Sequence, residues 1–160
     1  MKIALFAAAA LCLAAPAFAE DPTPTPVPNS AANAPVISPD GSLYKAFGGH
    51  DGLVRITDDL FVNIAADGRI STFFEAKKIP HIKAMLVEQF CEITGGGCIY
   101  SGKDMKSVHS QLGVTEDSFF ALVEDLQKAM DKNGVSFADQ NKLLGALAPQ
   151  SRDIVTGPAG

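Results

Sequence analysis

The most informative stretch of this chain is Gly95–His109, which reads GGGCIYSGKDMKSVH. Its glycines can adopt positive φ, so they allow a preceding helix to end and the chain to reverse direction. In its second half and just beyond, Met105, Val108 and Leu112 are spaced i, i+3 and i+7, which predicts a short amphipathic helix. His109 lies at the edge of that apolar stripe, so its imidazole can point inward. Alone, such a histidine is more often a core residue bonded to a backbone carbonyl than a metal ligand.

The rest of the domain is also expected to be helical. Apolar residues recur with a period near 3.6 in four segments, so we expect helices over 51–64, 80–93, 115–134 and 136–147. Shorter turns are expected at 42–47 and 70–74. No stretch alternates with a period of two, so no sheet is expected. Short, irregular helices favour an all-α fold packed at steep angles around a ligand over an up-down bundle.

Three polar residues are predicted to begin these helices. Asp51 and Thr115 are N-cap candidates, and Ser136 with Asp139 has the spacing of a capping box. Pro80 suits the first turn of its helix, where a missing N–H costs little.

The first 41 residues are predicted to lie outside the domain. Residues 1–19 read as a secretory signal peptide, with Lys2, an apolar run and the small-x-small pattern Ala17-Phe18-Ala19 before Glu20. Residues 20–41 carry prolines among small polar residues, which indicates an extended linker. We therefore expect a periplasmic or secreted protein without a membrane span once the signal peptide is cleaved.

Residues 42–155 are expected to form one domain, followed by a short tail at 156–160. The formal net charge is −5, and removal of Lys2 makes it one unit more negative. Nucleic-acid binding needs a basic face, so we expect no nucleic-acid partner.

Two cysteines, Cys91 and Cys98, follow the signal peptide. An even count in an exported protein favours a disulfide, although two separate thiols are the alternative. Covalent c-type haem attachment is not supported, because no C-x-x-C-H occurs. The three histidines are too scattered for a zinc site with two thiols.

Taken whole, the Gly95–His109 stretch resembles the proximal segment of the group I truncated haemoglobins. Further pieces resemble the same family in the same order and without an evident gap. They are Leu43-Tyr44 followed by Gly48-Gly49, Asp58 to Ile64 with Ala66-Asp67, Phe73-Phe74, and Phe119 to Leu126. The resemblance covers about residues 42–155. It implies an all-α, truncated globin-like fold, a 2-on-2 helical sandwich around haem.

The resemblance also implies the cofactor and its site. In the family the matching histidine binds the haem iron, so His109 is the expected proximal ligand of a non-covalent haem b, and Phe74 is expected to stack on the macrocycle. The proximal and inner walls are expected to consist of Tyr100, Met105, Val114, Phe119, Leu122 and Leu126.

The distal side departs from the family pattern. Many group I members place a tyrosine and a glutamine there, which donate hydrogen bonds to bound oxygen. The matching positions here are Phe61, Ile82 and Leu86, and none carries a donor. Losing a hydrogen bond of about 1.5 to 3 kcal/mol weakens oxygen retention about tenfold to a hundredfold. Tight oxygen storage and efficient nitric oxide dioxygenation are therefore disfavoured, and the residues leave open whether the chain is an enzyme.

Two functions follow as expectations. The first is an exported haem protein with an apolar distal pocket that binds diatomic gases (O2, NO or CO). The alternative is an electron-transfer haem protein with a periplasmic redox partner, in which Met85 is the second axial ligand opposite His109. Methionine is also a common filler of irregular cores, so Met85 as simple packing is the competing interpretation.

Overall fold

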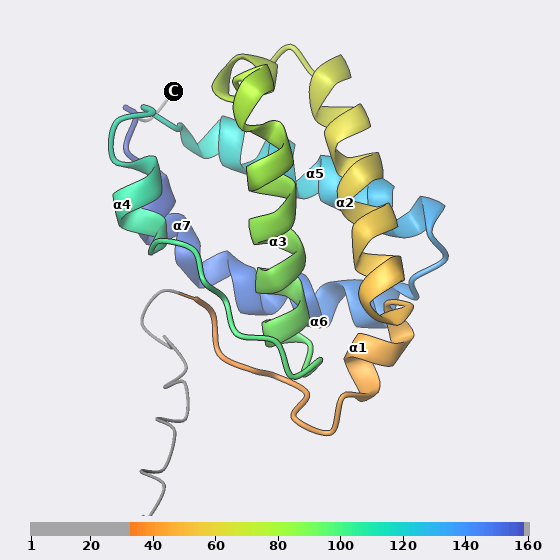
Figure 1. The fold of residues 1–160 in the computed structure, drawn as a ribbon. Coiled ribbons are helices and arrows are strands. Elements are labelled where there is room, and N and C mark those ends of the chain that lie inside the picture. The colour runs from red at the N-terminus through yellow and green to blue at the C-terminus, as the bar shows by residue number, and fades with distance from the viewer. Residues whose placement is uncertain (1–32, 159–160) are drawn as a thin grey trace, which may run out of the picture.

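Figure 1 shows the computed structural model, which describes residues 33–158. The predicted signal peptide, and the linker up to residue 32, lie outside the described residues. The described part contains seven α-helices and three short 3₁₀ helices. They are α1 (Ser42–Ala46), α2 (Gly49–Ala66), η1 (Ser71–Phe73), η2 (Ala76–Lys78), α3 (Ile79–Ile93), α4 (Met105–His109), α5 (Glu116–Lys132), α6 (Phe137–Leu147), η3 (Ala148–Gln150) and α7 (Ser151–Ile154).

The long helices form two crossed layers. Helices α2 and α3 lie side by side in one layer, and α5 and α6 cross behind them (Figure 1). Helix α2 packs against both α3 and α5, and α6 packs against α3 and α5. The short helix α4 lies at one end of this sandwich, next to α7. No strand occurs in residues 33–158, so the all-α prediction is confirmed.

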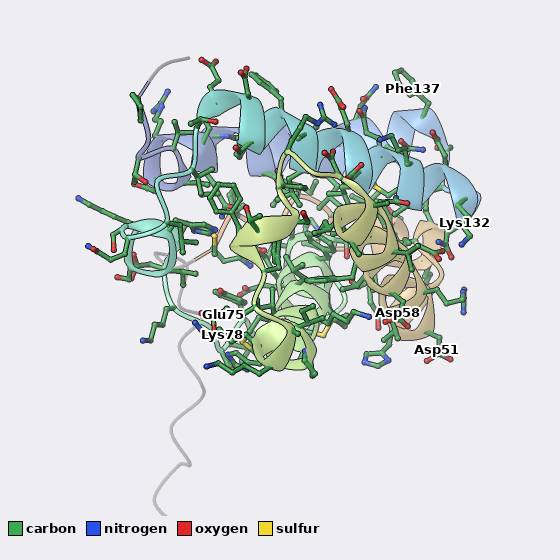
Figure 2. The ribbon with its side chains drawn as sticks, turned by 90° about the horizontal axis from the view of Figure 1, so that it is seen from above. Asp51, Asp58, Glu75, Lys78, Lys132 and Phe137 are labelled. Atoms are coloured by element: carbon green, nitrogen blue, oxygen red, sulfur yellow. A yellow bond between two sulfur atoms is a disulfide. The ribbon has the colours of Figure 1, made fainter. Side chains whose placement is uncertain are left out.

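Burial follows the predicted stripes. On α2, Leu53, Ile56, Leu60 and Ile64 are almost fully buried, at 0 to 2% exposed. The opposite side of the helix carries acidic residues such as Asp51 and Asp58, which point outward in Figure 2. This one-sided pattern stabilises each helix by packing an apolar face into the shared core.

The helix starts agree with the predictions at two of the three predicted caps. The hydroxyl of Thr115 accepts from Ser118 N at 3.2 Å, and that of Ser136 accepts from Asp139 N at 3.2 Å. The Asp51 prediction is wrong, because α2 begins two residues earlier, after Gly48. Gly48 has φ +81°, which glycine adopts without strain, and this lets the helix start sooner.

The short helix α4 agrees with its predicted place but not with its predicted buried face. Val108 is 45% exposed and Leu112 is 41% exposed. Helix α4 instead turns Met105 and His109, which are four residues apart, toward the interior. A five-residue helix makes little more than one turn, so it can bury only one such pair.

Residues 33–41 belong to the predicted linker but pack on the domain. Asn33, Ala34 and Ser38 are 9%, 7% and 9% exposed, and Ile37 N donates to Ile93 O at 2.9 Å. This segment, hereafter the N-terminal arm, has no helix or strand. No helix within the described residues is long and apolar enough to cross a membrane.

Candidate functional site

A partly open apolar cavity lies between the two layers and α4. Its volume is about 230 Å³. Aliphatic and aromatic side chains from α2, α3, α5, α6 and α7 form most of its wall. The lining residues are Leu60, Leu86, Gln89, Phe90, Met105, His109, Phe119, Phe120, Leu122, Val123, Leu126, Leu144, Leu147, Ala148, Gln150 and Ile154. The cavity therefore gathers residues that are far apart in the sequence around one histidine.

One ring nitrogen of His109 makes a hydrogen bond, and the other makes none within the described residues. Its Nδ1 lies 2.8 Å from the backbone carbonyl oxygen of Met105. A carbonyl only accepts, so Nδ1 carries the proton and donates. The other nitrogen, Nε2, keeps its lone pair on the neutral ring, and no protein group within residues 33–158 bonds to it. A metal-binding histidine usually has such a bond on its other nitrogen, so this contact is compatible with a ligand as well as with a core residue.

Six of the predicted site residues line this cavity. They are Leu86, Met105, His109, Phe119, Leu122 and Leu126. The other predicted residues are buried or half-buried outside its wall. They are Phe61, Phe74, Ile82, Met85, Tyr100 and Val114.

Phe61 and Phe74 pack against each other at the end of α2. Their ring centroids are 5.5 Å apart in an edge-to-face arrangement, and Phe61 is 6% exposed. The ammonium of Lys83 lies 5.4 Å from the Phe61 ring centroid and 2.8 Å from an Asp58 carboxylate oxygen. Phe61, at the predicted distal position, is thus an aromatic ring that carries no hydrogen-bond donor.

Two lining residues, Gln89 and Gln150, were not predicted as site residues. Gln89 is 4% exposed, and its Nε2 donates to Gln150 Oε1 at 3.3 Å and approaches the Met105 sulfur at 4.0 Å. Gln89 follows Leu86 by three residues, which puts both on one face of the helix expected over 80–93, so its position carried a signal. Gln150 follows Pro149, beyond the last predicted helix, and no local pattern pointed to it.

The loop before α4 is covalently linked to α3. Cys91 and Cys98 form a disulfide with 5.7 Å between their Cα atoms, so the predicted pairing is confirmed. Tyr100 is 5% exposed, and its hydroxyl donates to Lys103 O at 2.9 Å. Burial raises the pKa of Tyr100 above its ordinary value, which already lies well above neutral pH, so the hydroxyl is protonated and can donate this bond.

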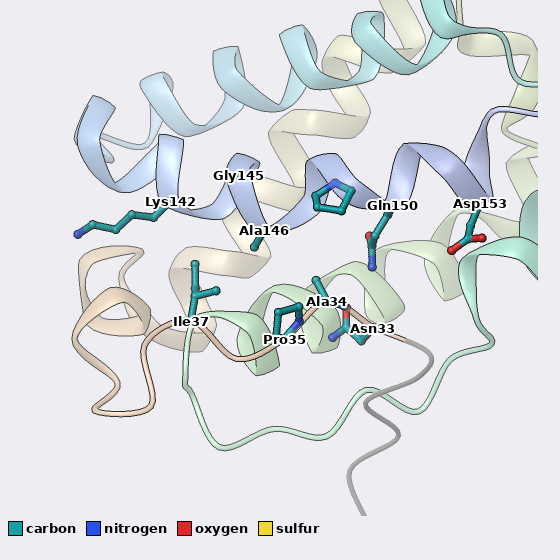
Figure 3. Close-up of a pocket in the computed structure, with 10 residues that line it drawn as sticks. Asn33, Ala34, Pro35, Ile37, Lys142, Gly145, Ala146, Gln150 and Asp153 are labelled. Atoms are coloured by element: carbon teal, nitrogen blue, oxygen red, sulfur yellow. The ribbon is translucent and has the colours of Figure 1, made fainter.

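A second, more open groove lies on the far side of α6 and η3. The N-terminal arm runs along one wall of it, as Figure 3 shows. Its volume is about 580 Å³, and its rim includes Lys142 and Asp153. Gln150 lines both this groove and the apolar cavity. No histidine or cysteine lines the groove, so it lacks the preferred nitrogen and sulfur ligands of a transition metal.

Comparison with known proteins identifies the family. The bacterial-like globin family matches residues 42–155. Group 1 truncated hemoglobin GlbN of Mycolicibacterium paratuberculosis is 34% identical over 119 residues, which cover 74% of this chain and 88% of that relative. The chain belongs to the bacterial-like globins, as a group 1 truncated haemoglobin. The predicted family is thereby confirmed.

Solved structures of truncated haemoglobins share the fold. Truncated hemoglobin from Tetrahymena pyriformis in its Fe(III) form has a TM-score of 0.67 and 22% identity, covering 71% of this chain and 97% of that one. The 2/2 hemoglobin from Synechococcus sp. PCC 7002, in the cyanomet state with covalently attached heme, has a TM-score of 0.66 and 21% identity, covering 71% and 98%. The predicted 2-on-2 sandwich is therefore confirmed.

Membership of this globin family implies that the chain binds haem. The side chains around the cavity suit haem, because one imidazole with a free Nε2 faces apolar walls. The lining residues therefore fit the group, which would be held by His109 and packed against the apolar walls.

Proposed function

We propose that this chain is an exported haem protein that binds diatomic gases, with His109 as the proximal iron ligand. The observation that carries the proposal is the His109 imidazole, whose Nδ1 donates to Met105 O while its ring lines the apolar cavity. Haem, when bound, would supply the iron that binds a diatomic ligand, and His109 would hold that iron. The carbonyl of Met105 would fix the ring orientation, and the apolar walls would pack against the macrocycle.

The polar groups near the cavity favour NO and CO over O2 as ligands. Phe61, Ile82 and Leu86 carry no donor, as the sequence already indicated. The amide of Gln89 has two N–H donors, but it faces Gln150 and the Met105 sulfur, on the helix that carries the proposed proximal ligand. Bound O2 carries partial charge and needs a hydrogen bond of about 1.5 to 3 kcal/mol for tight retention. NO and CO need less such help, so an apolar pocket suits them better.

Two features support export. The first is the leader-like pattern of residues 1–19. The second is the Cys91–Cys98 disulfide, because such bonds persist in oxidising compartments and are rare in the bacterial cytosol. We accordingly propose a periplasmic or secreted location and a non-covalent haem b, since no C-x-x-C-H motif is present.

The haem content of purified protein tests this proposal. We expect one haem per chain in a pyridine haemochrome assay. His109→Ala should lose most of the haem, because it removes the main bond between protein and iron. His50→Ala is the matched control, since that side chain is 65% exposed and outside the cavity. Full haem retention with unchanged spectra in His109→Ala would contradict the proposed ligand.

A further inference from the structure

Three contacts fix the loop between α3 and α4 to one face of α3. Cys98 is bonded to Cys91, Tyr100 N donates to Glu92 Oε2 at 3.2 Å, and Ser101 donates to Glu88 Oε2. The Ser101 bonds measure 3.0 Å from N and 2.6 Å from Oγ. Residues 88, 91 and 92 are spaced i, i+3 and i+4, so they share one face of the helix. We call these three contacts the loop clamp.

Glu92 is an acidic residue at a buried position of α3. It is 7% exposed, and no cation pairs with it within residues 33–158. Its carboxylate accepts from Tyr100 N and from Asn33 Nδ2, the latter at 2.7 Å. Burying an unpaired carboxylate is costly unless hydrogen bonds satisfy it. Glu92 therefore joins the loop and the N-terminal arm at one buried acceptor.

A continuous series of contacts leads from this clamp to His109. The Tyr100 hydroxyl donates to Lys103 O, and Gly102 has no room for a Cβ beside the Tyr100 ring. Asp104 then caps α4 by accepting from Ser107 N at 2.8 Å. The next residue, Met105, accepts through its carbonyl oxygen from the His109 imidazole, which lies one turn further along α4. The position of the imidazole thus depends on where the loop lies.

Helix α4 cannot fix that position alone. It has five residues, and an isolated helix of that length is not stable in water. None of its residues is fully buried, and its main helical neighbour is the four-residue α7. The loop clamp therefore connects α4 to α3, in addition to the direct packing of α4 on α7.

We propose that Glu88, Cys91 and Glu92 are positioning residues for the proximal histidine, and that the disulfide makes haem retention depend on thiol redox state. This inference rests on the proposed role of His109. A dithiol reductant breaks the sulfur–sulfur bond by exchange, so Cys91 and Cys98 each gain an S–H and the reductant becomes a cyclic disulfide. Cys98 is only half-buried, so exchange can begin at its side of the bond. The freed loop then holds α4 and His109 less firmly.

Haem loss from the loaded protein tests the redox part. Holoprotein is mixed with excess apomyoglobin, with and without dithiothreitol, and haem transfer is followed by absorbance. We expect transfer about tenfold faster after reduction, since a disulfide typically stabilises by more than the 1.4 kcal/mol that a factor of ten represents. The Cys91→Ser/Cys98→Ser variant should lose haem at the fast rate under both conditions. Equal rates for oxidised wild type and this variant would overturn the proposal.

The carboxylates are tested by a spectroscopic readout. The iron–imidazole stretching band of the ferrous protein reports the bond to His109. Glu92→Ala should shift or broaden this band, and Glu92→Gln, which keeps one acceptor oxygen, should partly restore it. Glu124→Gln is the matched control, because that exposed carboxylate pairs with Arg69 away from the loop clamp. Identical bands in wild type, Glu92→Ala and Glu88→Ala would remove the positioning role.

A measurement without haem separates this inference from the proposed function. Amide hydrogen exchange is compared in haem-free protein before and after reduction. We expect faster exchange at residues 98–109 and little change in α5 and α6. If the chain binds no haem, the proposed function fails, yet this exchange pattern still tests the loop clamp. Exchange that is unchanged, or equally faster in every helix, would overturn the clamp itself.

Discussion

At His109, one backbone carbonyl decides which ring nitrogen can bind a metal. The 2.8 Å bond from Nδ1 to Met105 O lies within a single turn of α4, so the ring orientation follows from the helix itself. The free Nε2 and the apolar wall then make the site suitable for haem iron rather than for a hydrated ion. If His109 binds the haem iron as proposed, the orientation of its ring depends on this hydrogen bond and on the position of α4.

Met85 is predicted to pack rather than to bind iron. It is half-buried on α3, but the cavity is lined by its neighbours Leu86 and Gln89 and not by Met85. Met85→Leu should leave the absorption spectra of the ligand-free ferric and ferrous proteins unchanged. A change from six-coordinate low-spin iron to five-coordinate or water-bound iron would instead support Met85 ligation and an electron-transfer role.

Thr57 is predicted to destabilise the native core slightly. It is 1% exposed, and its Oγ1 has no hydrogen-bond partner in the described residues. A buried hydroxyl without a partner costs about 1 to 3 kcal/mol. The nearly isosteric Thr57→Val should therefore raise the unfolding free energy by about 1 kcal/mol in urea titrations.

Thr94 is the matched control for that experiment. It is fully buried like Thr57, but its hydroxyl donates to Phe90 O at 2.6 Å. Thr94→Val removes a made bond and should lower the unfolding free energy by about 1 kcal/mol. Equal losses in both variants would mean that Thr57 has a partner in solution, such as a bound water.

The sequence predicted part of the cavity wall, but a place on a long helix did not suffice, because Phe61, Ile82 and Met85 lie on α2 and α3 and still fall outside the wall. Leu86, Leu122 and Leu126 face the cavity because the period of 3.6 already placed them inward. Tyr100 and Val114 are buried elsewhere, since they lie in loops whose path no periodicity describes. The pairing of Gln89 with Gln150 joins residues 61 positions apart, which a local pattern cannot indicate.

Among the helices, ends with a side-chain cap were predictable and ends with a glycine were less so. Thr115 and Ser136 cap α5 and α6 because their hydroxyls reach N–H groups three residues ahead. At α2, Gly48 takes that place through backbone conformation alone, and Asp51 becomes a first-turn residue. There it still favours the helix, because a negative charge near the N-terminus complements the dipole.

The cap of α4 is predicted to weaken in acid. The Ser107 hydroxyl and N–H bonds hold the pKa of Asp104 below its ordinary value of 3.8. A carboxyl whose folded pKa is lowered stabilises the native state above its unfolded pKa, and this contribution is lost as pH falls below about 3.8. Asp104→Asn keeps a capping oxygen but does not titrate.

Urea titrations of wild type and Asp104→Asn between pH 6 and pH 3 isolate this effect. Several other carboxylates, including Asp59 and Asp139, also have lowered pKa values. Their contributions cancel in the difference between the two proteins. We expect that difference to be largest near pH 6 and to shrink below pH 3.8. A difference that does not change with pH would show that the negative charge of Asp104 does not contribute to the stability of the cap.

In the whole molecule, the N-terminal arm extends the folded unit beyond the region that matches the family. The family match begins at residue 42, and composition alone assigned residues 33–41 to the linker. The prolines and small residues of this segment predicted no helix or strand, and the structure has neither in residues 33–41. Burial came instead from pairing with α3, through Asn33 to Glu92 and Ile37 to Ile93. Such long-range partners are outside the reach of local sequence patterns.

A chain that begins at Ser42 is therefore predicted to be less stable than one that begins at Asn33. The truncation removes the Asn33 and Ile37 hydrogen bonds and leaves the buried Glu92 with one donor fewer. Two such bonds contribute about 2 kcal/mol, and the unsatisfied carboxylate adds to the loss. Urea unfolding of the two haem-free chains measures the difference. Asn33→Ala in the longer chain should reproduce the part of the loss that comes from the Asn33–Glu92 bond, because the Ile37 bond remains. Equal stabilities would place the domain boundary at residue 42 and make the arm a passive linker after all.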